Sequence, residues 1–80
     1  MDVYLFIEKF ENEFNDLPKG LLKPDTKIMD MKEWWDSLNV MIAIAFAKIE
    51  FGANIEKNDI FEANTINDLF NNILKKANTK

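Results

Sequence analysis

Residues 36–52 read DSLNVMIAIAFAKIEFG, and this stretch decides the fold. Asp and Ser are both good helix N-caps, because their oxygens accept hydrogen bonds from the free amides of the first turn. The closing Gly is a helix stop signal, and only three polar residues interrupt the apolar run between these ends. We therefore predict a helix from Asp36 or Ser37 to about Phe51. Because it is apolar on almost every face, it either lies centrally or has one face docked on a partner.

Two amphipathic helices are expected on either side of this segment. In residues 2–16, apolar side chains recur at three- and four-residue steps, which places them on one helical face, with Glu11 and other polar residues opposite. A similar stripe follows Thr65, and Thr65 with Asp68 resembles a capping box in which Asp replaces the usual Glu. We predict one helix over 2–16 and a last helix that starts at Thr65 and leaves 77–80 as a frayed tail.

The two connections are less regular. Residues 58–63 have room for about one helical turn, with Asn58 or Asp59 as its cap. Residues 17–35 show no long helical period, but they contain apolar side chains that could hold the segment across the core. These side chains are Leu21, Leu22, Ile28, Met29, Met31, Trp34 and Trp35. We predict a long ordered crossover loop with a short helical turn, within an all-α bundle of three long helices and one short helix.

The composition limits both architecture and function. The chain has 80 residues with no Cys and no His, so a single domain spanning 1–80 must build its core from apolar side chains, which make up 48%. The net charge of −4 comes without a basic stripe, so we expect no nucleic-acid partner. The longest apolar run, 40–47, is too short to span a membrane, and no signal peptide is apparent. We therefore expect a cytoplasmic monomer that does not bind membranes.

Asp36 and Ser37 are the residues whose side chains and position best suit a chemical role. A hydroxyl in the first turn of a helix lies beside free amides and a partial positive charge, and both favour an attached phosphate. The simpler explanation is that Asp-Ser is a common helix cap. A small enzyme using Glu33 and Asp36 is also conceivable, but solvated loop charges explain these residues better. Without His or Cys the commonest catalytic side chains are missing, so we expect no catalytic residue and no metal ligand.

The wider context of this segment resembles the acyl carrier protein family, which includes the peptidyl and aminoacyl carriers. The leading helix and the long loop match that family in length and order, so the resemblance spans most of the chain. Its most specific part lies in residues 36–70. The similar residues are Asp36-Ser37-Leu38 opening a helix, Ile49-Glu50-Phe51-Gly52 closing it, Ile55, Ile60-Phe61, and Thr65-Ile66-Asn67-Asp68-Leu69 at the last helix start.

The resemblance implies a four-helix bundle and a carrier function. Ser37 would hold a 4'-phosphopantetheine arm, donated by coenzyme A through a separate phosphopantetheinyl transferase that uses magnesium and recognises Asp36. A loading ligase or synthetase would attach an acyl or aminoacyl group to the thiol of the arm, and an acyltransferase or synthase would accept it. The chain would then perform no bond chemistry itself, which makes sense of its missing His and Cys.

The chain departs from the family pattern at two places. Trp34 stands where carriers often have Gly. We favour the interpretation that Trp34 and Trp35 hold the loop to the core; the alternative is that one indole ring lies against the arm or a partner. In the second long helix, the acidic row of the fatty-acid-synthesis carriers is replaced by Asn39, Ile42, Lys48 and Ile49. We therefore expect a specialised pathway and a flatter, more apolar partner surface, whose docking depends little on salt. Its residues would be Leu38, Met41, Ile42, Ala45 and Ile49.

An alternative is consistent with the same apolar helix. The chain would then be a small helical adaptor that binds a partner protein through this helix and is never modified. Modification of Ser37 separates the two hypotheses.

Overall fold

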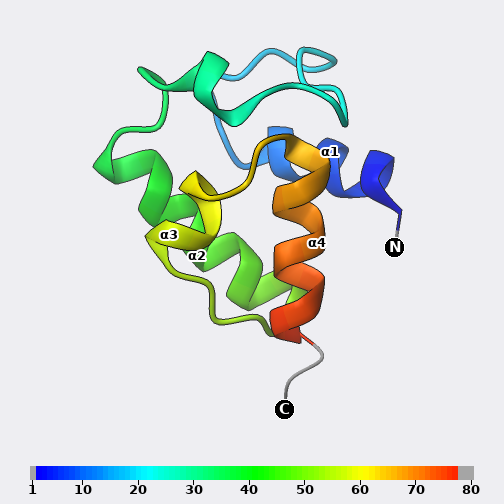
Figure 1. Ribbon diagram of the computed structural model, residues 1–80. Coiled ribbons are helices and arrows are strands. Elements are labelled where there is room, and N and C mark those ends of the chain that lie inside the picture. Colours follow the sequence, from blue (N-terminus) through cyan, green and yellow to red (C-terminus); the bar gives the residue numbers. More distant parts are fainter. Residues whose placement is uncertain (1, 78–80) are drawn as a thin grey trace.

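Helices account for most of the computed structural model, which describes residues 2–77 (Figure 1). This part of the chain forms four α-helices and one short 3₁₀ helix in the predicted order. Their bounds are α1 Val3–Asn12, η1 Ile28–Met31, α2 Ser37–Phe51, α3 Lys57–Phe61 and α4 Ile66–Ala77. The all-α prediction is confirmed. None of these helices is both long enough and apolar enough to cross a membrane.

Helix α2 has the ends that its sequence predicts. The Asp36 carboxylate accepts a hydrogen bond of 2.8 Å from the backbone amide of Asn39, so Asp36 is the N-cap and Ser37 is the first helical residue. At the other end Gly52 adopts a left-handed conformation with φ 66°, which glycine reaches without the steric cost other residues meet. Its amide donates to the Lys48 carbonyl at 3.0 Å. Both helix signals in the sequence therefore act as expected.

Helix α1 is shorter than predicted, and one of its polar residues is misassigned. It ends at Asn12, not Asp16, and a turn then places Phe14 and Leu17 in the core outside the helix. Glu11 was expected on the solvent side, but it is buried. Its two carboxylate oxygens accept hydrogen bonds of 2.9 Å each from the amides of Gly20 and Leu22. The carboxylate is therefore buried because it binds the first part of the loop that follows.

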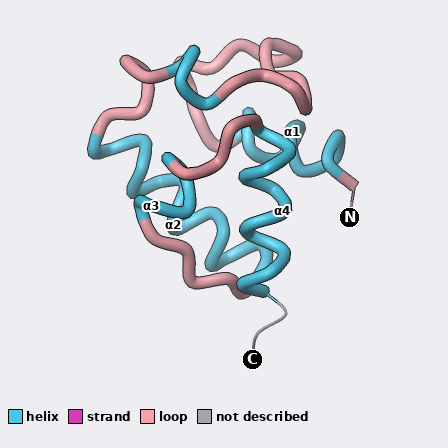
Figure 2. Tube along the Cα trace, viewed as in Figure 1, coloured by secondary structure: helices cyan, strands magenta, loops and turns pink. Residues whose placement is uncertain are grey.

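The connection between α1 and α2 is an ordered crossover loop that runs across one end of the helices, as predicted (Figure 2). The predicted short turn is η1. Leu22, Ile28 and Trp35 are buried, and Met31 and Trp34 pack against the core. The other two apolar residues expected to hold the loop, Leu21 and Met29, are instead more than half exposed.

Backbone hydrogen bonds also tie this loop to the start of α4. The amide of Ile28 donates to Asn64 at 3.0 Å, and the amide of Ile66 donates to Thr26 at 2.9 Å. The Thr65 and Asp68 capping box is confirmed, because each side chain accepts a hydrogen bond from the other residue's amide. The expected frayed tail lies, except for its first residue, outside the described residues.

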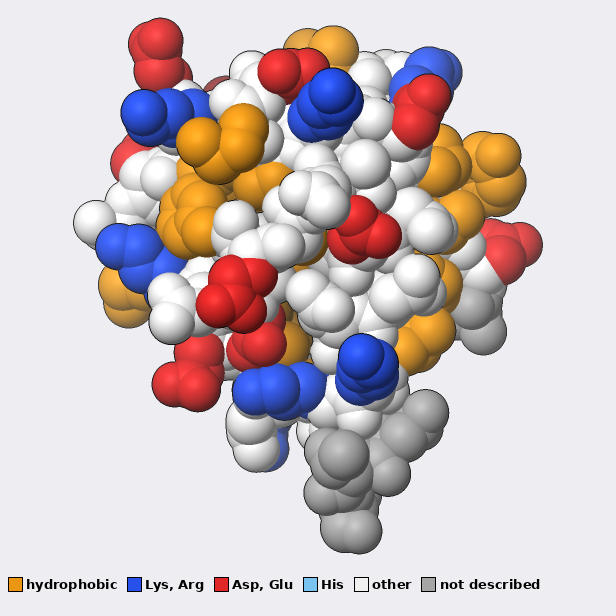
Figure 3. Space-filling model, viewed as in Figure 1, with side chains coloured by type: hydrophobic (Ala, Val, Ile, Leu, Met, Phe, Trp, Pro, Cys, Tyr) orange, Lys and Arg blue, Asp and Glu red, His pale blue; other side chains and the backbone are white. Residues whose placement is uncertain are grey.

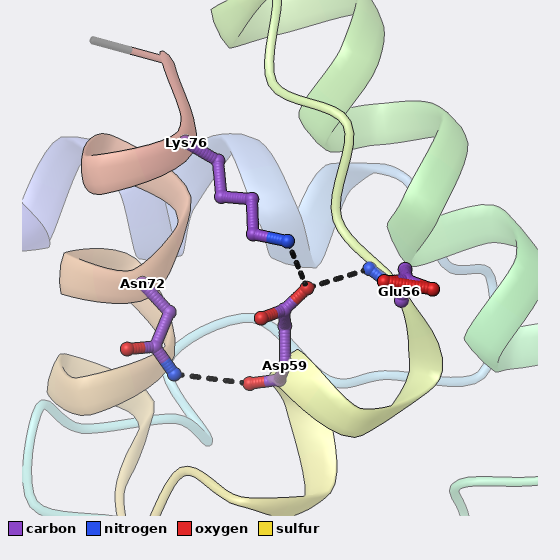
Figure 4. A network of polar contacts seen from close by, with 4 residues as sticks. All are labelled: Glu56, Asp59, Asn72 and Lys76. Carbon is purple, nitrogen blue, oxygen red and sulfur yellow. Dashed lines mark hydrogen bonds and ion pairs between the residues drawn. The ribbon is translucent and has the colours of Figure 1, made fainter. Parts of the chain in front are cut away.

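Helix α3 begins one residue earlier than predicted, and its cap is Glu56 instead of Asn58 or Asp59. Asp59 contributes from inside the helix, where its carboxylate accepts the Glu56 amide at 2.7 Å and lies 3.2 Å from the Lys76 ammonium (Figure 4). The Asn72 side chain donates to the Asp59 carbonyl at 3.0 Å. These contacts fix the short helix to α4, which explains how five residues form a stable element.

One aromatic core fills the space between the helices. Phe6 is fully buried and contacts four other rings, with its centroid 5.0 Å from that of Phe70. On the face of the molecule over α4, polar and charged side chains predominate, and apolar side chains gather toward the two sides (Figure 3). Helix α4 buries four residues of its predicted apolar stripe, and the fifth, Leu74, is half-buried against the core; the buried four are Ile66, Leu69, Phe70 and Ile73.

Candidate functional site at the start of helix α2

The segment that leads into α2 is held by backbone hydrogen bonds. The amides of Trp34 and Trp35 donate to the Met31 carbonyl at 2.9 and 3.1 Å, and the Asp36 amide donates to the Trp34 carbonyl at 2.8 Å. These bonds continue the turn of η1 up to the first residue of α2. The position of Ser37 is thus set by the loop as well as by its own helix.

Ser37 is the only serine in the sequence, and its side chain is exposed. Within residues 2–77 its hydroxyl makes no hydrogen bond, because the cap of α2 is the Asp36 carboxylate. The two threonine hydroxyls of this part of the chain are engaged: that of Thr26 accepts the Lys23 amide, and that of Thr65 accepts the Asp68 amide. Ser37 is therefore the one exposed aliphatic hydroxyl in residues 2–77 that is available for modification.

The first turn of α2 is suited to a phosphate. The Asp36 carboxylate accepts a hydrogen bond from the backbone amide of Asn39, but in the described part of the chain the backbone amides of Ser37 and Leu38 have no acceptor. Free amides at a helix N-terminus point toward solvent and carry the positive end of the helix dipole. A phosphodiester on the Ser37 oxygen would lie close to both amides.

Ser37 lies on the rim of a pocket of about 460 Å³, which we call the serine pocket. Val40, Met41 and Phe61 give it apolar walls, and Lys57 from α3 adds one positive charge. The Lys57 ammonium lies 5.9 Å from the centre of the Phe61 ring. Sequence reasoning missed the contribution of α3 to this site, because residues twenty positions apart in the chain meet only through the packing of α2 on α3.

Four of the five residues predicted to face a partner are exposed on α2. Leu38, Met41 and Ile49 are 64%, 67% and 78% exposed, and Ala45 is exposed between them. Ile42 is half-buried and packs against the core, so it lies at the edge of this surface. We call the exposed residues Leu38, Met41, Ala45 and Ile49 the α2 stripe. Their three- and four-residue spacing puts them along one side of the helix.

Asn39 does not belong to that surface. Asn39 is one of the four residues that stand where the fatty-acid-synthesis carriers have acidic residues. Its side chain is buried, however, and the side-chain amide nitrogen donates to the Trp34 carbonyl at 2.8 Å. The residue links the first turn of α2 to the loop before it. Of the four replacements, Lys48 and Ile49 are exposed, so the stripe still lacks the negative charge of an acidic row.

Both tryptophans pack against the core and so help to hold the loop to it. Trp35 is buried, and the Trp34 ring packs edge-on against Phe14 with centroids 4.6 Å apart. The Trp34 indole N–H donates to the Asp16 carboxylate at 3.3 Å. Trp35 also lines the serine pocket, and its indole nitrogen is buried with no hydrogen-bond partner within residues 2–77. A donor beside the pocket is therefore unpaired.

The third hypothesis, a carboxylate enzyme, gains no support from the geometry. Glu33 is exposed on the loop, and the Asp36 carboxylate is engaged as the helix cap. In the part of the chain that the structure describes, no three acidic side chains come together in a way that could hold a metal ion.

Comparisons with known proteins assign this chain to no group: no family model, no curated protein and no solved structure matches it.

Proposed function

We propose that this protein is an acyl or aminoacyl carrier whose Ser37 holds a 4'-phosphopantetheine arm. The observation that carries the proposal is the free, exposed Ser37 hydroxyl at the start of α2, beside two unpaired amides and a pocket. The order of helices and the crossover loop agree with an acyl-carrier-like bundle.

The modification itself is a phosphoryl transfer from coenzyme A. The Ser37 oxygen attacks the phosphorus atom that bears the pantetheine, a new O–P bond forms, and the P–O bond of the pyrophosphate link breaks. The adenosine bisphosphate leaves, and a base on the transferase takes the serine proton. This chain contributes an accessible nucleophile and a rigid frame around it, because both neighbours of Ser37 are held by hydrogen bonds or helix geometry.

The residues around Ser37 fit such an arm. The phosphodiester would lie beside the amides of Ser37 and Leu38, and Lys57 adds a positive charge at the same pocket. When bound, the arm supplies the thiol that the protein lacks, and an acyl or aminoacyl group attaches there as a thioester. Loading ligases and accepting transferases would then dock on the α2 stripe, in a specialised biosynthetic pathway.

The α2 stripe also supports the second candidate, an unmodified adaptor. Three large apolar side chains, Leu38, Met41 and Ile49, are each more than half exposed on one helix. Such a surface is typical of protein–protein contacts. The adaptor hypothesis requires this surface but has no use for a free hydroxyl at Ser37.

Intact mass spectrometry tests the proposal. The purified protein is incubated with coenzyme A, magnesium and a broad-specificity phosphopantetheinyl transferase. We expect one phosphopantetheinyl mass increment, complete absence of it in Ser37→Ala, and full labelling of Tyr4→Phe, which lacks the exposed tyrosine hydroxyl. Because Asp36 caps the helix, Ser37→Ala should fold normally.

Two results would contradict the carrier hypothesis. The first is an unlabelled wild-type protein under conditions that label a known carrier in the same tube. The second is an increment that persists in Ser37→Ala. The first result would leave the adaptor as the better explanation of the exposed stripe, and the second would show that the arm is attached to a residue other than Ser37.

A further inference from the structure

A second surface pocket lies in the crossover loop, and Ser37 is not among its lining residues. It has a volume of about 520 Å³, and we call it the loop pocket. Its apolar lining comes from Leu17, Leu21, Met29, Met31 and Trp34. Leu21 and Met29 are 55% and 56% exposed, although Leu22, Ile28 and Trp35 of the same loop are buried. Exposed leucine and methionine side chains around a hollow are typical of sites that take an apolar side chain from a partner.

The loop pocket is shaped before any partner binds. The amides of Asp30, Lys32 and Trp34 each donate to a carbonyl three or fewer residues back, within η1 and the turn that follows. The Trp34 indole is held by its hydrogen bond to Asp16 and by its contact with Phe14. Binding there would therefore cost little ordering of the chain.

The rim of the pocket is acidic. Asp16, Asp30 and Glu33 line it together with a single basic residue, Lys32. Asp30 and Glu33 are exposed, and within residues 2–77 no basic side chain pairs with either of them. A partner with positive charges around an apolar side chain would meet complementary groups at both the floor and the rim.

We propose that the loop pocket is a docking site for a basic amphipathic segment of a partner protein, with one bulky apolar side chain in the hollow. This goes beyond the proposed carrier function, since it requires neither the arm nor the α2 stripe. The two pockets share no lining residue: Trp34 lines the loop pocket, and Trp35 lines the serine pocket. Because the two indole rings are in contact at 4.8 Å, a partner at the loop pocket would be close to the start of α2.

The test uses a short synthetic peptide of lysine and leucine with one central phenylalanine, and a second peptide with glutamate in place of lysine. Binding is followed by NMR through the indole N–H signals of Trp34 and Trp35. We expect the basic peptide to shift the Trp34 signal more than the Trp35 signal, with weaker binding at high salt. The acidic peptide should not bind.

Matched variants locate the site. Leu21→Gln combined with Met29→Gln should weaken peptide binding about tenfold, because the apolar floor is lost. Met41→Gln removes an even more exposed methionine from the α2 stripe and should leave the dissociation constant unchanged within about twofold. All three residues are exposed, so these variants retain the fold.

The proposal is overturned if Met41→Gln weakens binding as much as the loop variant, or if the loop variant binds like the wild type. Equal binding of the two peptides would also overturn it, because the acidic rim would then play no part. None of these outcomes bears on whether Ser37 can be modified.

Discussion

Glu11 shows how one side chain organises a whole segment. Its carboxylate is buried and accepts two amide hydrogen bonds, from Gly20 and Leu22, where the chain turns back after α1. A carboxylate that accepts two hydrogen bonds from backbone amides provides partners for two donors that the loop would otherwise leave unpaired. The first half of the crossover loop therefore depends on a residue that lies in the preceding helix.

Replacing this residue should destabilise the protein. Glu11→Ala leaves the amides of Gly20 and Leu22 without their acceptor, so we expect the free energy of unfolding to fall by about 2 kcal/mol. Urea denaturation measures this change. Glu8→Ala removes an exposed glutamate from the same helix and should change the free energy by no more than about 0.5 kcal/mol. Equal effects of the two substitutions would show that the buried contacts contribute little.

Glu11 was assigned wrongly by periodicity, and the resemblance to the carrier family gave no sign that Asn39 is buried. A hydrophobic pattern treats a polar residue as solvent-facing, because burial of a polar group is costly unless it is paired. Both side chains are buried and paired, Glu11 with loop amides and Asn39 with the Trp34 carbonyl. Their partners lie in irregular segments, and no pattern of the sequence locates the backbone groups of an irregular segment.

Among the elements, the presence of each helix was predicted from the sequence more reliably than the residue at which it ends. The extents of α2 and the start of α4 were predicted because capping residues act locally. The end of α1 was not, since Phe14 and Leu17 continue its apolar period although they lie in a turn. Core packing selects apolar side chains in turns and helices alike, so periodicity alone cannot locate that boundary. Likewise, the sequence singled out Ser37 as the candidate site, whereas it gave no sign that α3 lines the pocket beside it.

The short helix α3 leads to a prediction about its local stability. Its five residues are too few for an isolated helix, so its stability must come from contacts such as those of Asp59 with Glu56 and Lys76. Asp59→Ala should increase the hydrogen exchange rate of the α3 amides several-fold with α4 little affected, as measured by NMR. Glu62→Ala, an exposed change just after the helix, is the control. Unchanged exchange in Asp59→Ala would mean that the packing of Ile60 and the Asn72 hydrogen bond to the backbone carbonyl of residue 59 are enough to hold α3.

At the scale of the whole molecule, one aromatic network joins the four α-helices and the Trp pair of the crossover loop. All seven phenylalanines and both tryptophans are linked through ring contacts, with centroids 4.6 to 6.4 Å apart. A domain of 80 residues without disulfides has little apolar area to spare, and large rings bury the most area per residue. The network extends from α4 through α1 to the Trp pair beside Ser37. The stability of the core and the position of the candidate site are therefore connected.

The last prediction concerns Phe70, which lies at the end of the aromatic network away from the Trp pair. Phe70 on α4 is buried against Phe6, so Phe70→Ala should lower the free energy of unfolding by about 3 kcal/mol or more, through lost contacts and the cavity left behind. Ile49→Ala removes an apolar side chain that is 78% exposed and should cost less than about 1 kcal/mol. Thermal and urea denaturation of both variants measure the difference. If Phe70→Ala melted like the wild type, α4 could not be packed on the core through this ring, and the assignment of its buried face would be wrong.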